Sequence, residues 1–203
     1  MRPTIRYLHR MSACIVLTFV IAHLTNHLVG LASQQAHREM LVSLRQVYRH
    51  PVVEPILLVS FAWQILSGLS LVALGWRTRR GAIEWMQAGS GLALAAFLAV
   101  HVSAVLAGRA SGLDTDLRFA AAGFHVPNWP FFFTPYYFTA ILAVFIHVGA
   151  AAYWVRGRGT AGTMGFAVAS LSGVLIASAI VLMLAGHVVP LTIEAQYKTL
   201  FAP

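Results

Sequence analysis

Histidines are the residues of this chain best suited to chemistry inside a membrane. Nine occur among 203 residues, of which only 10% are charged. Four of them, His23, His27, His101 and His147, lie within apolar runs and away from the arginines. Ionisable side chains at such positions are rare and usually mark function. An imidazole there binds a metal such as heme iron or zinc, relays protons, or forms a hydrogen bond between helices.

Two of these histidines have matching surroundings. Each follows a phenylalanine by four residues, and each follows a pair of small residues that begins eleven positions earlier. The matching residues are Ser12-Ala13 and Phe19 before His23, and Ser90-Gly91 and Phe97 before His101. Two imidazoles at one depth on two helices are what a six-coordinate b-type heme requires. We therefore predict that His23 and His101 are the axial ligands of a heme iron.

His27 leaves an alternative open. It lies one helical turn beyond His23 on the same face, so it is either the iron ligand in place of His23 or a group that serves a heme propionate or a quinone. Zinc is the rival metal, but the sequence offers no carboxylate at that depth and no evident third ligand. The single cysteine, Cys14, excludes an intrachain disulfide and a cysteine-based iron–sulfur site.

Five apolar stretches must position these histidines, and each is long enough to cross a bilayer. They cover residues 11–31, 51–74, 83–106, 136–155 and 164–188. Alternating strand patterns are absent, and helices satisfy their own backbone groups in lipid. The composition agrees, because 59% of the residues are hydrophobic. The sequence thus predicts an all-α integral membrane bundle of five transmembrane helices, forming a single domain over residues 1–203.

The distribution of charge predicts an orientation. Fourteen basic and six acidic residues give a net charge of +8. The arginines fall at the ends of the apolar stretches, which indicates topological anchoring and no nucleic-acid surface. Eight lie on the side of the N-terminus and six basic residues on the other. We expect a cytoplasmic N-terminus and an outside C-terminus in the bacterial inner membrane, with the first stretch retained because it is too long for a signal peptide.

The third connection, residues 107–135, is long for a helical bundle. Its stretch His125–Phe133 is rich in aromatic residues and is interrupted by prolines. Such a stretch is typical of an aromatic belt at the membrane interface. The alternative is a lid over an outward-facing site.

Several segments resemble the membrane cytochrome b subunit of succinate:quinone oxidoreductases and fumarate reductases, in its single-subunit, five-helix, diheme form. The matching segments are Tyr7–Ala13 with His23–Asn26, Gln87–Gly91 leading to His101, and Phe145–His147. In length and helix count the resemblance covers essentially the whole chain. It implies an outer heme held by His23 and His101, and a second, inner heme with His147 as one ligand.

Gln64 stands where the resemblance implies the partner ligand of His147. Setting Gly68 against the family's glycine, four residues past the second-helix histidine, puts Gln64 at the ligand position. Glutamine is a poor ligand of heme iron, whereas an imidazole and an amide form an ordinary hydrogen bond between helices. We therefore expect one firmly bound heme b and an incomplete second site, with Gln64 facing His147.

Glu54 lies at the outer start of the second stretch, where the family has an acid near its quinone site. Together with His27 it forms the candidate quinone site, because a carboxylate there would accept a proton as quinol is oxidised. The alternative is a first-turn acid stabilised by the helix dipole.

The resemblance implies a membrane b-type heme protein that transfers electrons between a quinone and a redox partner. The partner would be a flavoprotein and iron–sulfur subunit docking near His9 and Arg10 or, for a stand-alone quinone oxidoreductase, a small outer donor such as superoxide. Contacts with membrane lipid and a homo-oligomer fit either form. The alternative class is a non-redox membrane protein, a transporter or structural subunit whose histidines form hydrogen bonds.

Overall fold

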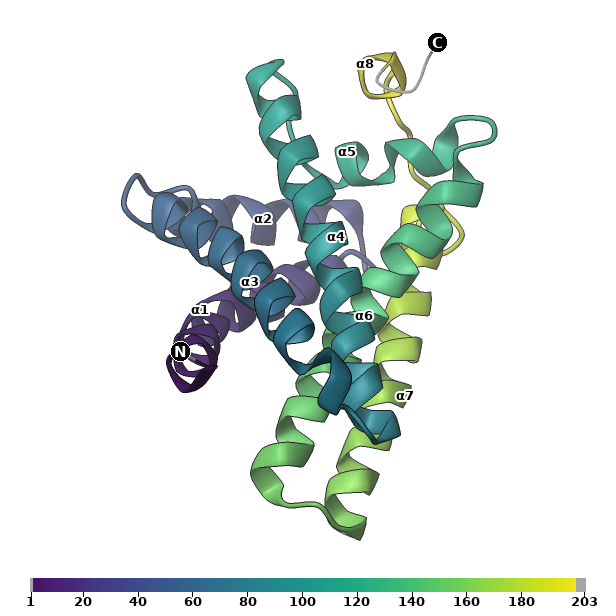
Figure 1. Ribbon diagram of the computed structural model, residues 1–203. Helices are drawn as coiled ribbons and strands as arrows, with labels where there is room; N and C mark the ends of the chain where they lie inside the picture. Colours follow the sequence, from purple (N-terminus) through teal and green to yellow (C-terminus); the bar gives the residue numbers. More distant parts are fainter. Residues whose placement is uncertain (1, 200–203) are drawn as a thin grey trace.

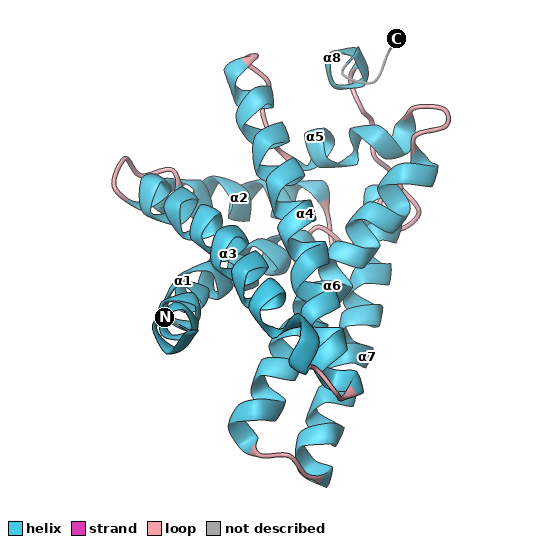
Figure 2. Ribbon diagram, in the orientation of Figure 1, coloured by secondary structure: helices cyan, strands magenta, loops and turns pink. Residues whose placement is uncertain are grey.

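The computed structural model describes residues 2–199, and within them every regular element is a helix (Figures 1 and 2). Five helices are long and apolar enough to cross a membrane. They are α1 (Arg2–Val29), α3 (Val53–Gly75), α4 (Ala82–Ala110), α6 (Pro130–Arg156) and α7 (Thr160–Leu184). The 25 residues of α7 span roughly 38 Å, more than the hydrocarbon core of about 30 Å. The predicted all-α fold with five candidate spans is confirmed.

Consecutive long helices are antiparallel. In Figure 1, α4 lies between α3 and α6, and α7 runs alongside α6, which is its main contact. The start of α1 contacts the end of α3, through His9 and Ser67. The bundle therefore has an N-terminal end, with the start of α1 and the connections 76–81 and 157–159, and an opposite end. We call the opposite end the α2 end, after the short helix that lies there.

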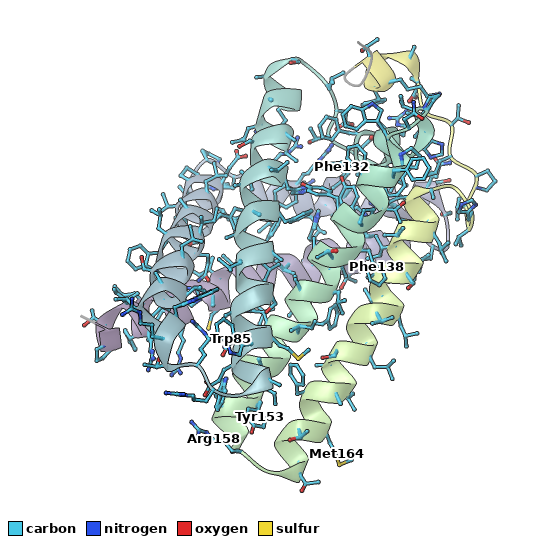
Figure 3. All side chains as sticks on the ribbon, turned by 45° about the vertical axis from the view of Figure 1, so that its right-hand side comes forward. Trp85, Phe132, Phe138, Tyr153, Arg158 and Met164 are labelled. Atoms are coloured by element: carbon cyan, nitrogen blue, oxygen red, sulfur yellow. The ribbon has the colours of Figure 1, made fainter. Side chains whose placement is uncertain are left out.

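The outer surface of α7 is apolar. Met164, Val168, Leu171 and Leu175 are each at least 60% exposed, and their spacing places them on one face of the helix. Figure 3 shows Met164 projecting away from the bundle. An exposed apolar stripe of this length is a lipid-facing surface, because water would penalise it. The protein is accordingly an integral membrane protein.

Aromatic residues and arginines mark both ends of the bundle. Figure 3 places Trp85, Tyr153 and Arg158 at the N-terminal end and Phe132 toward the α2 end. The Arg158 guanidinium lies over the ring of Trp154, 4.7 Å from its centroid. Such residues sit at the two interfaces of a membrane protein, where an amphipathic ring or a guanidinium contacts both water and headgroups.

The connection between the first two spans contains a helix that the sequence did not lead us to expect. This is α2 (Gln34–Tyr48). The Ser33 hydroxyl caps it by accepting a hydrogen bond from the Ala36 amide at 3.0 Å, as N-cap serines do. It buries His37 and Leu41, one helical turn apart, against the bundle. The helix therefore brings one further histidine to the end of α1.

The long third connection is also structured. It contains α5 (Leu117–Ala121) and the 3-10 turn η2 (Ala122–His125), and α6 begins at Pro130, so Phe131–Phe133 form the first turn of that helix. The rings of Phe124 and Phe133 lie 6.0 Å apart. Together with the end of α7 and α8 (Ala195–Lys198), these elements enclose the main buried core, which includes Ile180, Met183, Leu184 and Tyr197. Phe124 and Phe133 thus pack at the α2 end, whereas Phe131 and Phe132 are exposed.

Candidate functional site

His23 and His101 meet inside the bundle although 78 residues separate them. Their ring centroids are 6.2 Å apart, with an angle of 64° between the ring planes. Both belong to long apolar helices, α1 and α4. Neither helix has the other as its main partner, since α1 packs chiefly on α3, and α4 on α3 and α6. The two imidazoles therefore approach each other across the interior, from opposite walls.

Each of these imidazoles is held by the phenylalanine one turn earlier. Phe19 stacks on His23 with centroids 5.4 Å apart and 14° between the planes. Phe97 stacks on His101 at 4.9 Å and 15°. The repeated spacing in the sequence thus produces the same local geometry on both helices. Stacking of this kind restricts ring rotation and orients the nitrogens.

The separation of the two rings fits a shared metal ion. An imidazole nitrogen lies about 2 Å from a bound metal ion, so two imidazoles on opposite sides of one ion have centroids roughly 6 Å apart. Within residues 2–199 no three histidine, cysteine or carboxylate side chains converge to hold a bare ion. A heme needs only two protein ligands, because its macrocycle supplies the other four. The donor set therefore fits heme iron better than zinc.

Two more histidines, His27 and His37, extend this pair toward the α2 end. The ring of His27 lies 4.8 Å from that of His23 and 5.3 Å from that of His37. The His27 Nδ1 atom is buried and has no hydrogen-bond partner among the described residues. A buried nitrogen without a partner costs free energy unless a ligand or water meets it. His27 is therefore placed to donate to, or accept from, a bound molecule.

His37 connects this cluster to the α2 end. It is only 2% exposed, and its Nε2 atom is 3.1 Å from Nδ2 of the Asn26 side chain. Burial lowers the pKa of His37 to about 4, although the nearby Asp116 opposes that shift. His37 also lines a cavity of about 190 Å³ together with Gln34, Gln35, Arg38, Leu117 and Arg118. Neither this residue nor its place was predicted from the sequence, because the segment 34–48 is short and mostly polar and was not recognised as a helix.

Glu54 lies at the same end but in a different environment from His27. Its carboxylate forms an ion pair with Arg109 of α4. Arg45 pairs with Asp114 at 2.7 Å, and Arg49 donates to the Thr115 hydroxyl at 2.9 Å. Glu54 is thus part of an arginine-rich surface layer, and its carboxylate is bound to a guanidinium.

His147 lies toward the opposite, N-terminal end, and its surroundings differ from those we expected. Its Nδ1 atom is 3.1 Å from the backbone oxygen of Gln87 and 3.3 Å from the Ser90 hydroxyl. The expected partner, Gln64, instead donates to the His9 backbone oxygen at 2.7 Å and to the Ser12 hydroxyl at 2.6 Å. The amide is turned toward α1 because α1 packs directly on that face of α3.

Comparison with known protein families, with characterised proteins and with solved structures found no match to this chain. The candidate site consequently rests on its own geometry.

Proposed function

We propose that this protein is a membrane-embedded b-type cytochrome that transfers electrons between a quinone and a redox partner. The observation that carries the proposal is the His23–His101 pair: two imidazoles on two spanning helices, 6.2 Å apart, each stacked on a phenylalanine. A non-redox helix bundle has no reason to align two imidazoles in this way, since a single histidine suffices for a hydrogen bond.

In this proposal His23 and His101 hold the iron of one heme b, and Phe19 and Phe97 orient their rings. A heme bound there would accept and release single electrons at a potential that its ligands and the low polarity of the site adjust. His23 is the ligand in preference to His27, because its stacking partner matches that of His101.

The proposed quinone site is formed by His27 and Glu54. The unpartnered Nδ1 atom of His27 lies next to the His23 ring, within the cluster. It would hydrogen-bond a quinone oxygen close to the heme. Glu54, paired with Arg109 at the α2 end, would take up the proton released on quinol oxidation. With the expected orientation, protons would leave on the outside of a bacterial inner membrane.

The proposal allows two kinds of redox partner, which differ in where they would bind. A flavoprotein and iron–sulfur subunit would dock at the N-terminal end, near His9 and Arg10, as in succinate dehydrogenase-like complexes. A stand-alone form would take electrons from a small donor at the α2 end. A homo-oligomer is compatible with either arrangement.

The test is reduction of the purified protein by a short-chain quinol, followed by the heme absorbance. We expect wild type to be reduced, and His101→Ala to lack the part of the heme absorbance that belongs to the His23–His101 pair. His187→Ala, in the turn after α7 and outside the pair, is the matched control and should behave as wild type. A colourless wild-type protein would support the alternative, a transporter or structural subunit whose histidines form hydrogen bonds. A coloured protein that no quinol reduces would reject the quinone role.

A further inference from the structure

A second pair of histidines lies toward the N-terminal end, and the two are held in the same way. His9 of α1 contacts α3, His147 of α6 contacts α4, and these two neighbouring helices pack on each other. The Nδ1 atom of His9 is 2.7 Å from the hydroxyl of Ser67 on α3. The Nδ1 atom of His147 contacts Gln87 and Ser90 on α4. Each imidazole thus uses one nitrogen to bind a neighbouring helix.

Each of these two histidines also lies against a glycine of the neighbouring helix. Gly68 follows Ser67, and a Cβ atom built on it would lie 3.5 Å from Cε1 of His9. Gly91 follows Ser90, and its Cβ would lie 3.1 Å from Cε1 of His147. A Ser-Gly pair on α3 therefore receives His9, and a Ser-Gly pair on α4 receives His147. The missing side chains let both rings lie against the backbone of the neighbouring helix.

The hydrogen bonds fix which nitrogen of each ring carries the proton. The backbone oxygen of Gln87 only accepts, so Nδ1 of His147 donates to it. The Ser67 hydroxyl donates to the Trp63 backbone oxygen, so it accepts from Nδ1 of His9. In the neutral tautomer, both rings then present an unprotonated Nε2. Metal-ligating histidines are held in this way, with one nitrogen donating to the protein and the other free for the metal.

We propose that His9 and His147 are the axial ligands of a second heme, at the N-terminal end of the bundle. The inference rests on the proposed function and goes beyond it, because the resemblance implied a ligand at the position of Gln64. That position does not fit: the Gln64 amide is already bound to Ser12 and the His9 backbone. The ligand has moved from α3 to α1. Two imidazoles without a third donor suit a heme and not a bare metal ion.

The test is the heme-to-protein ratio of the purified full-length chain, measured by the pyridine hemochromogen method. We expect two hemes in wild type and one in each of His9→Ala, His147→Ala and the double variant that combines them. The combination of His9→Ala with His101→Ala should contain none. His50→Ala, a histidine outside both pairs, is the matched control and should retain two.

The outcomes separate this inference from the proposed function. A wild-type protein with one heme, unchanged by His9→Ala and by His147→Ala, would overturn the second site and leave the first intact. Two hemes that survive His9→Ala would overturn the ligand assignment. No heme in wild type would refute the proposed function itself.

A variant that fails to fold would not leave the question open, because the wild-type protein gives a second readout. Near-infrared magnetic circular dichroism of its oxidised form distinguishes bis-imidazole heme iron from iron with other axial ligands. We expect two bis-imidazole centres. A second centre with one non-imidazole ligand would overturn the role of His9.

Discussion

At the α2 end, His23 and His101 are oriented by stacked phenylalanines, and their ring centroids lie 6.2 Å apart. At the N-terminal end, His9 and His147 are oriented by hydrogen bonds to Ser67 on α3 and to Gln87 and Ser90 on α4, and each ring lies against a glycine. The first pair is held by its own helices and the second by its neighbours. A ligand held by its own helix can be recognised from local spacing, whereas a ligand held by a neighbour depends on helix rotation and packing.

The largest effect is expected when the space beside His147 is filled. Gly91→Leu should displace the ring, because even a Cβ atom would lie 3.1 Å from Cε1. We expect loss of the N-terminal-end heme, a fall of one in the heme-to-protein ratio, with the α2-end heme retained. Gly89→Leu is the matched control, since nothing lies within 4 Å of a Cβ atom at that position. Equal heme content in the two variants would show that His147 is not a ligand.

A weaker effect is expected when the hydrogen bond to His9 is removed. Ser67→Ala leaves the ring in place but takes away the acceptor for its Nδ1. Partners of this kind affect metal affinity by about 10- to 100-fold. The rate of heme transfer to a heme-free globin should rise accordingly for the N-terminal-end heme alone. Ser70→Ala is the matched control, because the Ser70 hydroxyl on the same helix donates to the Leu66 backbone oxygen and, among the described residues, to no histidine. A rate equal to that control would contradict the anchoring role.

The phenylalanine contacts should have a smaller effect. Phe97→Ala removes the ring stacked on His101, and an aromatic contact of this kind contributes about 0.5–1.5 kcal/mol. We expect the affinity of the α2-end heme to fall by up to about tenfold, with the other heme unchanged. Phe131→Ala, at a position that is 86% exposed, serves as the control. If both hemes weaken equally in Phe97→Ala, the two ends are not independent.

The smallest effect concerns pH and the His37 side chain. Its pKa is lowered to about 4 by burial, with Arg45 adding to the shift and Asp116 opposing it; Arg38 and Arg118 line the adjoining cavity. Between pH 6.5 and 4 the unfolded chain binds a proton that the folded protein does not. Stability is therefore full above pH 6.5 and falls as the pH drops toward 4.

The thermal midpoint of wild type should accordingly fall by a few degrees between pH 7.5 and 5. His37→Gln should lose less, because its amide still meets Asn26 but does not titrate. Identical losses in the two proteins would show that His37 remains uncharged or is charged at both pH values.

The five spans could be predicted from the sequence because each is a long apolar run, a signal that depends on nothing outside the helix. The meeting of His23 and His101 could be predicted too, since equal spacing along two helices of the same direction gives equal depth. The helix α2 was missed because it is short and mostly polar, and Ser33 as an N-cap was its main signal.

The orientation of the Gln64 side chain could not be predicted from the sequence, for a different reason. Helix rise gives the depth of a residue, and by depth Gln64 and His147 do correspond. The direction in which a side chain points depends on the rotation of its helix, which packing of α1 on α3 determines. For the same reason His9 looked like an edge residue in the sequence, although it reaches Ser67 across the helix interface.

Whether the His23–His101 pair binds heme is decided by a reduced-minus-oxidised visible spectrum of the purified wild-type protein. We predict a Soret band and an α band of the b type, both lost together in the variant that combines His101→Ala with His9→Ala. A wild-type spectrum without these bands would show that the pair binds no heme.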